Sequence, residues 1–203
     1  TPTTAERGAA TLVFGMPDDS EWYTDVVRAG GGDWARKVDS NDRTYFKTTL
    51  ELEAADSFWT RTEPEAFEIG RSSDNPTLLP KLARQRVSSA SVFGEQEIEN
   101  IGDTYAWGVF TVKGPATAIL AIGPNGETVH WVGNLTAGQT LTIDMRANTV
   151  KDQSGTNRYN GLQPAPKFWP IAPGTSQVTV QVDDTTAESL ATVQWWPRKW
   201  AVV

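Results

Sequence analysis

The stretch from Phe168 to Val182 constrains the fold more than any other part of this chain. Its first half is rich in aromatic residues and proline, and Pro173-Gly174 is typical of a turn because proline fixes φ. Its second half alternates strictly, which places Val178, Val180 and Val182 on one face and polar residues on the other. β-branched residues at a period of two predict a half-buried strand. A slip of one residue would move all three valines into water, so this segment fixes the register of a sheet.

The remaining sequence predicts an all-β protein. Twelve prolines and seventeen glycines interrupt the chain every few residues, which favours short strands and turns over helices. From Arg86 onward, alternating segments recur at about the 8–12-residue spacing of all-β sandwiches. Pro124-Asn125-Gly126 predicts a tight hairpin, and 81–85 could form one helical turn. The expected strands are 65–69, 87–93, 96–100, 105–113, 118–122, 128–132, 140–146, 149–152, 177–182 and 190–196.

Residues 1–62 predict a sheet that is not complete by itself. Strands are expected at 9–16, 21–29 and 44–54, and the last shows the cleanest alternation in the chain. So few strands leave open edges and little chain to cover an apolar face. We therefore expect neighbouring copies, sequence upstream of Thr1, or both to complete the sheet, and we expect the sequence to be part of a longer protein. A hinge at 61–64 would separate domains at 1–62 and 63–203.

Composition excludes several classes of protein. The absence of cysteine removes disulfides, thiolate nucleophiles and cysteine-based zinc sites. A net charge of −7 argues against unspecific nucleic-acid binding, which needs a basic face. No segment approaches the ~18 consecutive apolar residues that predict a membrane-spanning helix, and no signal peptide is visible.

The sequence offers no convincing catalytic motif. His130 is the only histidine, and it lies in a predicted strand without a serine or cysteine nucleophile motif elsewhere. A catalytic triad needs a nucleophile, a base and an orienting acid together, so a structural role is favoured for His130. No phosphate-binding or zinc-protease motif occurs.

Two acidic patterns have a functional and a structural interpretation. Glu95, Glu97 and Glu99 alternate on one strand face and Asp183-Asp184 form a turn, which could suggest a glycosidase pair; a solvated strand edge is the more typical origin. Asp152, Ser154 and Asn157 could contribute to a calcium site, but they offer few of the ~6–8 oxygens required, so turn chemistry is favoured. We therefore expect no catalytic, cofactor-binding or metal-ligating residues.

Three blocks resemble the distal tail proteins (siphovirus-type tail components) of long-tailed, non-contractile bacteriophages. WPIAPGTSQVTV, at 169–180, is similar to the apolar-Pro-Gly turn before the family's last hairpin. ELEAADSFW, at 51–59, resembles a strand that ends in Asp-Pro-Phe-Trp, with Ser57 in place of the proline. NIGDTYAWGVFTVKGP, at 100–115, resembles an Asn-Pro-Gly turn and the strand after it, with Ile101 in place of the proline. A short-turn hairpin, GQTLTID at 138–144 and the run 149–159 follow in the family's order.

The resemblance implies a structural protein of the virion without enzymatic activity or cofactor. It implies part of an N-terminal belt domain, which assembles into a homo-oligomeric, usually hexameric ring, followed by a galectin-like β-sandwich. Such a ring lies at the distal end of the tail, joins the tail tube protein to the tail hub protein, and lets the tape-measure protein and DNA pass. The protein would be made in the host cytoplasm. The alternative is a carbohydrate-binding sandwich that contacts host cell-wall glycans.

Within this framework two sets of residues acquire expected roles. A channel for DNA works best when phosphates do not adhere to its wall, which predicts a carboxylate-lined channel formed by Asp18, Asp19, Glu21 and Asp25. Large aromatic side chains dominate interface energetics, which predicts a contact between copies through Trp22, Tyr23, Trp34, Phe46 and Trp59; burial within one copy is the alternative. Among the nine tryptophans, Trp107, Trp131 and Trp169 are expected in the core, and some exposure is expected for Trp195, Trp196 and Trp200.

Overall fold

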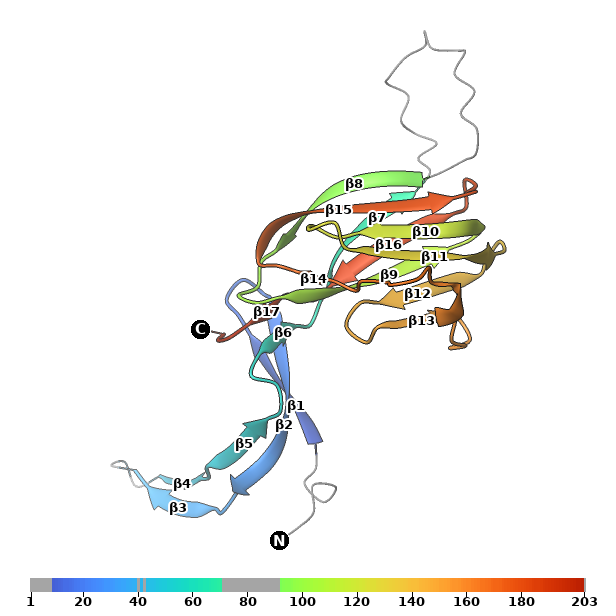
Figure 1. Ribbon diagram of the computed structural model, residues 1–203. Helices are drawn as coiled ribbons and strands as arrows, with labels where there is room; N and C mark the ends of the chain where they lie inside the picture. Colours follow the sequence, from blue (N-terminus) through green and yellow to red (C-terminus); the bar gives the residue numbers. More distant parts are fainter. Residues whose placement is uncertain (1–8, 40, 42, 71–91, 203) are drawn as a thin grey trace. The chain divides into compact units, whose positions relative to one another are not determined.

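The computed structural model describes residues 9–39, 41, 43–70 and 92–202, and these residues are organised almost entirely as strands (Figure 1). Within those ranges the helical element is the short 3-10 helix η2 (Tyr159–Gly161), so the predicted all-β class is confirmed. A helix long and apolar enough to cross a membrane does not occur in the described ranges. Contacts divide the chain into a first unit, Thr1–Thr62 with Lys199–Val203, and a second unit, Glu63–Arg198. Lys199–Val203 thus group with the first unit by their contacts, whereas the expected second domain spans 63–203.

The first unit is a sheet built around one long strand, β2. β1 pairs with one edge of β2, and β6 and then β5 pair with the opposite edge. β17 lies beside β6 at the end of the sheet order. The strands are β1 (Ala9–Gly15), β2 (Glu21–Gly31), β5 (Leu50–Ala54), β6 (Trp59–Arg61) and β17 (Arg198–Lys199), of which Lys199 belongs to this unit.

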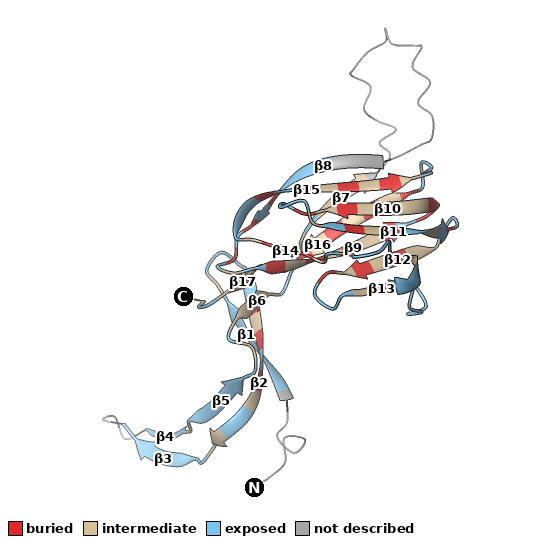
Figure 2. Ribbon diagram, viewed as in Figure 1, coloured by how far each residue is buried: buried red, intermediate tan, exposed pale blue. Residues whose placement is uncertain are grey.

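A two-stranded hairpin, the arm, continues from the far end of this sheet. It consists of β3 (Ala35–Val38) and β4 (Thr44–Lys47), which pair antiparallel, and we define the arm as residues 34–47. Asp39 holds its tip, because Oδ1 accepts hydrogen bonds from the backbone N–H groups of Asn41 and Arg43 at 2.9 and 2.8 Å. In Figure 2 the strands of the arm are coloured as exposed.

The continuous strand predicted at 44–54 is wrong in one respect. The chain leaves strand geometry at Thr48 and Thr49, so β4 and β5 are separate strands. Gly31 lies opposite this break with φ +74°, and the N–H of Gly32 donates to the Thr49 carbonyl at 2.8 Å. A positive φ is readily adopted only by glycine, so the sequence places the break here.

The second unit is a sandwich of two antiparallel sheets. One sheet has the order β11-β10-β15-β8, and the other has the order β13-β12-β9-β16-β7 with β14 also beside β9. The first contains β8 (Val92–Asn100), β10 (Ala116–Ile122), β11 (Thr128–Leu135) and β15 (Gly174–Asp183). The second contains β7 (Glu65–Gly70), β9 (Ala106–Lys113), β12 (Thr140–Asp144), β13 (Thr149–Asp152), β14 (Pro170–Ile171) and β16 (Leu190–Trp195). Buried apolar side chains from both sheets pack into one core.

The segment 168–182 joins the two sheets. β14 pairs with β9 in one sheet, the Pro173-Gly174 corner follows, and β15 pairs with β8 and β10 in the other sheet. Gly174 has φ +84°, as a tight corner requires. Val178, Val180 and Val182 are buried, and Gln177 is exposed. The predicted alternation of this strand is therefore confirmed.

Asn100 forms hydrogen bonds both to β14, just before the Pro173-Gly174 corner, and to the turn at 101–104. Its side chain is buried at the end of β8, where Nδ2 donates to the carbonyls of Thr104 and Ile171 at 2.9 and 3.1 Å. Its Oδ1 accepts a hydrogen bond from the N–H of Gly102 at 3.0 Å. The amide thus closes the 101–104 turn and holds β14 beside it, with Ile101 in the position that proline occupies in the resembled family.

Other predictions had mixed outcomes. The hairpin at Pro124-Asn125-Gly126 is confirmed, since it joins β10 to β11 with Gly126 at φ +79°. Trp131 and Trp169 are in the core as expected and Trp200 is exposed, but Trp195 is buried in the core, where exposure was expected. Strands β3, β6, β14 and β17 were not predicted. The helical turn at 81–85 and most of the strand at 87–93 lie outside the described residues.

Candidate functional site

The sheet of the first unit has two chemically different faces. Along β2, Trp22, Thr24 and Val26 are buried, whereas the residues between them are exposed or half-buried. Directly opposed residues of antiparallel strands share a face, so the register extends both faces across β1 and β5. One face therefore carries aromatic and apolar side chains, and the other face carries the acidic side chains.

All carboxylates of β1, β2 and β5 lie on one face, which we name the acidic face. Glu21 and Asp25 share it by alternation along β2, Glu53 joins it opposite Val27, and Glu51 joins it by alternation along β5. All four residues are exposed. Arg28, the basic residue of these three strands, lies on the opposite face, opposite Leu52. No ion pair joins these four carboxylates to a basic residue within the part of the chain that the structure describes.

The four carboxylates predicted to line a channel are only partly brought together. Glu21 and Asp25 lie on the acidic face, and Asp25 accepts a hydrogen bond from the Thr11 hydroxyl at 2.8 Å. Asp18 and Asp19 lie in the β1–β2 turn instead. Asp18 is engaged by Ser20, whose hydroxyl and backbone N–H both donate to it and lower its pKa. Glu51 and Glu53 were missed, although their alternation along the strand was visible in the sequence.

The aromatic residues predicted to contact a neighbouring copy fall into three places. Trp22 is only 1% exposed, with its ring beneath the Lys199 ammonium at 4.7 Å and its Nε1 donating to Ser20 Oγ at 3.1 Å. A buried ring has no area left for a partner, so we omit Trp22 from the contact surface. Trp59 lies on the same face, half-buried and edge-on to Phe14 at 6.3 Å, and Tyr23 is half-buried on the acidic face.

The remaining two aromatic residues expose their side chains on the arm. Trp34 is 72% exposed and Phe46 is 63% exposed, and all residues of β3 and β4 are exposed. An isolated two-stranded hairpin is at best marginally stable in water. Within the described residues of the first unit, no layer covers this hairpin.

The glutamates and the histidine considered in the second unit lie on strands of its first sheet. Glu95, Glu97 and Glu99 are exposed on β8, which ends its sheet order and pairs only with β15 among the described strands. Charges on such a strand oppose unwanted pairing. His130 lies within β11 opposite Leu120 of β10.

The Asp152 turn is held by hydrogen bonds to both carboxylate oxygens. Oδ1 accepts from the hydroxyl and N–H of Ser154 at 2.6 and 3.0 Å and from the N–H of Thr156 at 3.0 Å. Oδ2 accepts from Arg158 Nε at 2.9 Å. The Ser154 hydroxyl, followed by Arg158 and the backbone donors, lowers the pKa of Asp152 from 3.8 to about 2.

This pKa predicts a pH-dependent effect of Asp152→Asn. A folded-state pKa below the usual value means that the carboxylate form stabilises the fold above pH 3.8 and that this stabilisation is lost as pH falls through about 2. The variant should therefore melt at a lower temperature than the parent protein at pH 7, and the difference should narrow between pH 4 and pH 2. Thermal unfolding followed by circular dichroism measures this. Glu188→Gln, at an exposed position of the same unit, should show no such trend. A difference that stays constant to pH 2 would contradict the assignment.

Comparisons with known proteins agree with this architecture. Residues 102–199 match the family model described as the siphovirus-type tail component, C-terminal domain. Among solved structures, one match is titled the crystal structure of SPP1 Dit (gp 19.1), "a Paradigm of Hub Adsorption Apparatus in Gram-positive Infecting Phages", with a TM-score of 0.53 and 8% sequence identity. That alignment covers 90% of this chain and 66% of the SPP1 chain, so this chain spans just under two thirds of that protein's length. No curated protein matches. Residues 102–199 are thus similar to the C-terminal domain of siphovirus-type tail components, and the resemblance found in the sequence is confirmed.

Proposed function

We propose that this protein is a structural component of a bacteriophage tail tip, in which the first unit assembles into a closed ring of identical copies. The ring is hexameric, lies at the distal end of the tail, and joins the tail tube protein to the hub protein. The second unit is a galectin-like sandwich attached to this belt. The protein performs this task without catalysis or a cofactor.

The observation that supports ring assembly best is the uncovered arm. Trp34 and Phe46 expose most of their surface to solvent on a hairpin that no described layer covers. Burying large aromatic side chains is strongly favourable, and such residues dominate interface energetics. A closed ring of identical copies covers this surface on every subunit and ends without running on into a filament.

The acidic face supports a role in DNA passage. Unpaired carboxylates on one face of a small sheet repel one another, so their grouping lowers the stability of the sheet. A function for this face would account for that cost. A channel wall of this charge repels phosphates and lets DNA and the tape-measure protein pass without adhering. We place Glu21, Asp25, Glu51 and Glu53 on the channel wall, with Asp18 and Asp19 at its rim.

Replacing both Trp34 and Phe46 by alanine is expected to prevent ring assembly. Interface hot spots of this kind contribute about 2–4 kcal/mol each, so the double change should weaken each subunit contact by several hundredfold or more. Mass photometry of the purified protein should show rings for the parent protein and single subunits for the variant. Circular dichroism should show that the variant subunit keeps its β structure, because both side chains are exposed within one chain.

The matched control is Tyr105→Ala, which removes an aromatic side chain that is 54% exposed on the second unit. This variant should assemble like the parent protein. A parent protein that stays a single subunit at every concentration would overturn the ring proposal. Electron microscopy of the rings tests the channel separately. An acidic face on the outer wall would contradict the assignment of these carboxylates to the channel but would leave the ring proposal intact.

A further inference from the structure

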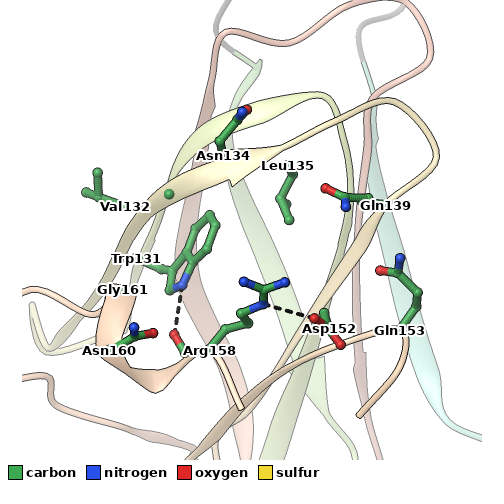
Figure 3. A pocket seen from close by; sticks show the side chains of 11 residues that line it. Trp131, Val132, Asn134, Leu135, Gln139, Asp152, Gln153, Arg158, Asn160 and Gly161 are labelled. Carbon is green, nitrogen blue, oxygen red and sulfur yellow. Dashed lines mark hydrogen bonds and ion pairs between the residues drawn. The ribbon is translucent and has the colours of Figure 1, made fainter. Parts of the chain in front are cut away.

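The second unit contains a polar pocket that the tail-tip role does not use. It has a volume of about 300 Å³ and lies where β11, β13 and η2 approach one another (Figure 3). A water molecule occupies roughly 30 Å³ of liquid, so the pocket has room for a small organic molecule rather than only a bare ion. Polar side chains from separate loops line it. Some of their hydrogen-bonding groups already have partners within the protein, and others do not.

Two glutamines present amide donors in fixed orientations. Gln139 Oε1 accepts a hydrogen bond from the N–H of Thr136 at 2.9 Å, and Gln153 Oε1 accepts from the N–H of Thr140 at 2.9 Å. A backbone N–H can only donate, so the accepting atom must be the oxygen in each case. Among the described residues, neither glutamine NH₂ group has a hydrogen-bond acceptor, so this end of each amide is available.

Arg158 adds two further donors. Its Nε donates to Asp152 Oδ2 at 2.9 Å, while the other oxygen of Asp152 is occupied by Ser154 and Thr156. Asp152 thus orients the guanidinium, and its own carboxylate is held by hydrogen bonds within the turn. In Figure 3 the Arg158 guanidinium lies between Trp131 on one side and Gln139 and Gln153 on the other. Its two terminal Nη groups have no partner within the described part of the chain.

The pocket offers no ring face for stacking. Trp131 is 4% exposed, and its Nε1 donates to the Arg158 carbonyl at 3.0 Å. Gly133 and Gly161 lie against this indole so closely that a Cβ on either would collide with it. A ligand here would be recognised by hydrogen-bond donors rather than by an aromatic platform.

We infer that this pocket binds the carboxylate or phosphate group of a small organic molecule, held by Arg158, Gln139 and Gln153. The unused groups of these three residues are all donors, and an oxyanion accepts hydrogen bonds without offering any. The fork of Nη groups matches two oxygens of one carboxylate or phosphate, and charge-assisted hydrogen bonds of this kind are about twice as strong as neutral ones. This inference concerns the second unit alone and does not depend on ring assembly.

The test titrates the whole protein with four probes and follows the NMR signals of the Gln139 and Gln153 side-chain amides. The probes are inorganic phosphate, glycerol 3-phosphate, glucuronate and glucose. We expect saturable shifts of these amides with glycerol 3-phosphate or glucuronate and none with glucose. Tighter binding of the organic anion than of inorganic phosphate would identify an organic ligand, whereas saturation by phosphate alone would overturn that part of the inference.

Three pocket variants and one control variant separate recognition from folding. Gln139→Glu and Gln153→Glu keep the oxygen that accepts the backbone hydrogen bond but replace the donor with a second oxygen, and each should weaken anion binding at least about tenfold. Arg158→Lys keeps the charge but loses the fork, and it should also weaken binding. Gln163→Glu adds the same charge at an exposed position outside the pocket lining and should leave binding within about twofold. Equal binding of glucose, no binding of any probe, or unchanged binding in the two pocket glutamate variants would each overturn the inference.

Discussion

Asn100→Asp is expected to lower the free energy of unfolding of the second unit by about 4 kcal/mol, because it places a carboxylate in a buried site that requires donors. The Asn100 amide donates to two carbonyl oxygens, those of Thr104 and Ile171. An aspartate oxygen in place of Nδ2 would lie against both carbonyl oxygens, and both hydrogen bonds would be lost. Urea unfolding followed by tryptophan fluorescence measures the change.

Asn157→Asp is the matched control for this substitution. Asn157 is exposed, and its Oδ1 accepts a hydrogen bond from the N–H of Tyr159 at 2.8 Å, an interaction that aspartate can keep. This variant should stay within about 0.5 kcal/mol of the parent protein, as surface changes usually do. Equal effects of the two substitutions would mean that Asn100 does not hold the two corners together.

Phe110→Ala is expected to destabilise the second unit by about 4 kcal/mol, the usual scale for removing a buried phenylalanine. Phe110 is 1% exposed in the centre of β9, and its ring meets Trp169 edge-on at 5.5 Å between centroids. It also covers Gly108, where a Cβ would approach the Phe110 ring to 2.9 Å. Alanine would leave a cavity that these rigid neighbours cannot fill.

The same urea experiment checks this prediction, with Phe110→Leu as the control. Leucine fills part of the space and should cost clearly less than alanine. If the two variants were equally stable, the ring of Phe110 would not be packed as described. The proposed assembly of the first unit need not be affected at temperatures where both variants remain folded.

The sequence predicted the second unit well because its strands bury one face. Val178, Val180 and Val182 alternate with polar residues because a core lies on one side of β15, and this periodicity is visible locally. In the first unit, β3 and β4 are exposed along their whole length, so periodicity does not report their limits. β3 and β6 escaped prediction because pairing with other strands, rather than burial, defines them.

The candidate site was predicted only where local alternation was sufficient. Glu21 and Asp25 could be grouped because they are four residues apart on one strand. Adding Glu53 required the register of β5 on β2, which the sequence does not reveal. The burial of Trp22 depends on Lys199, which lies at the other end of the chain. The donors of the pocket come from separate turns, so no motif connects Gln139 with Gln153.

The contact between Lys199 and Trp22 has a consequence for biosynthesis. A ribosome makes the chain from its amino terminus, so β2 emerges long before the residue that covers its tryptophan. The first unit acquires its last strand only after the whole sandwich has been translated. A chain still attached to the ribosome therefore lacks this strand of the first unit, and the proposed association of subunits would follow translation of the sandwich.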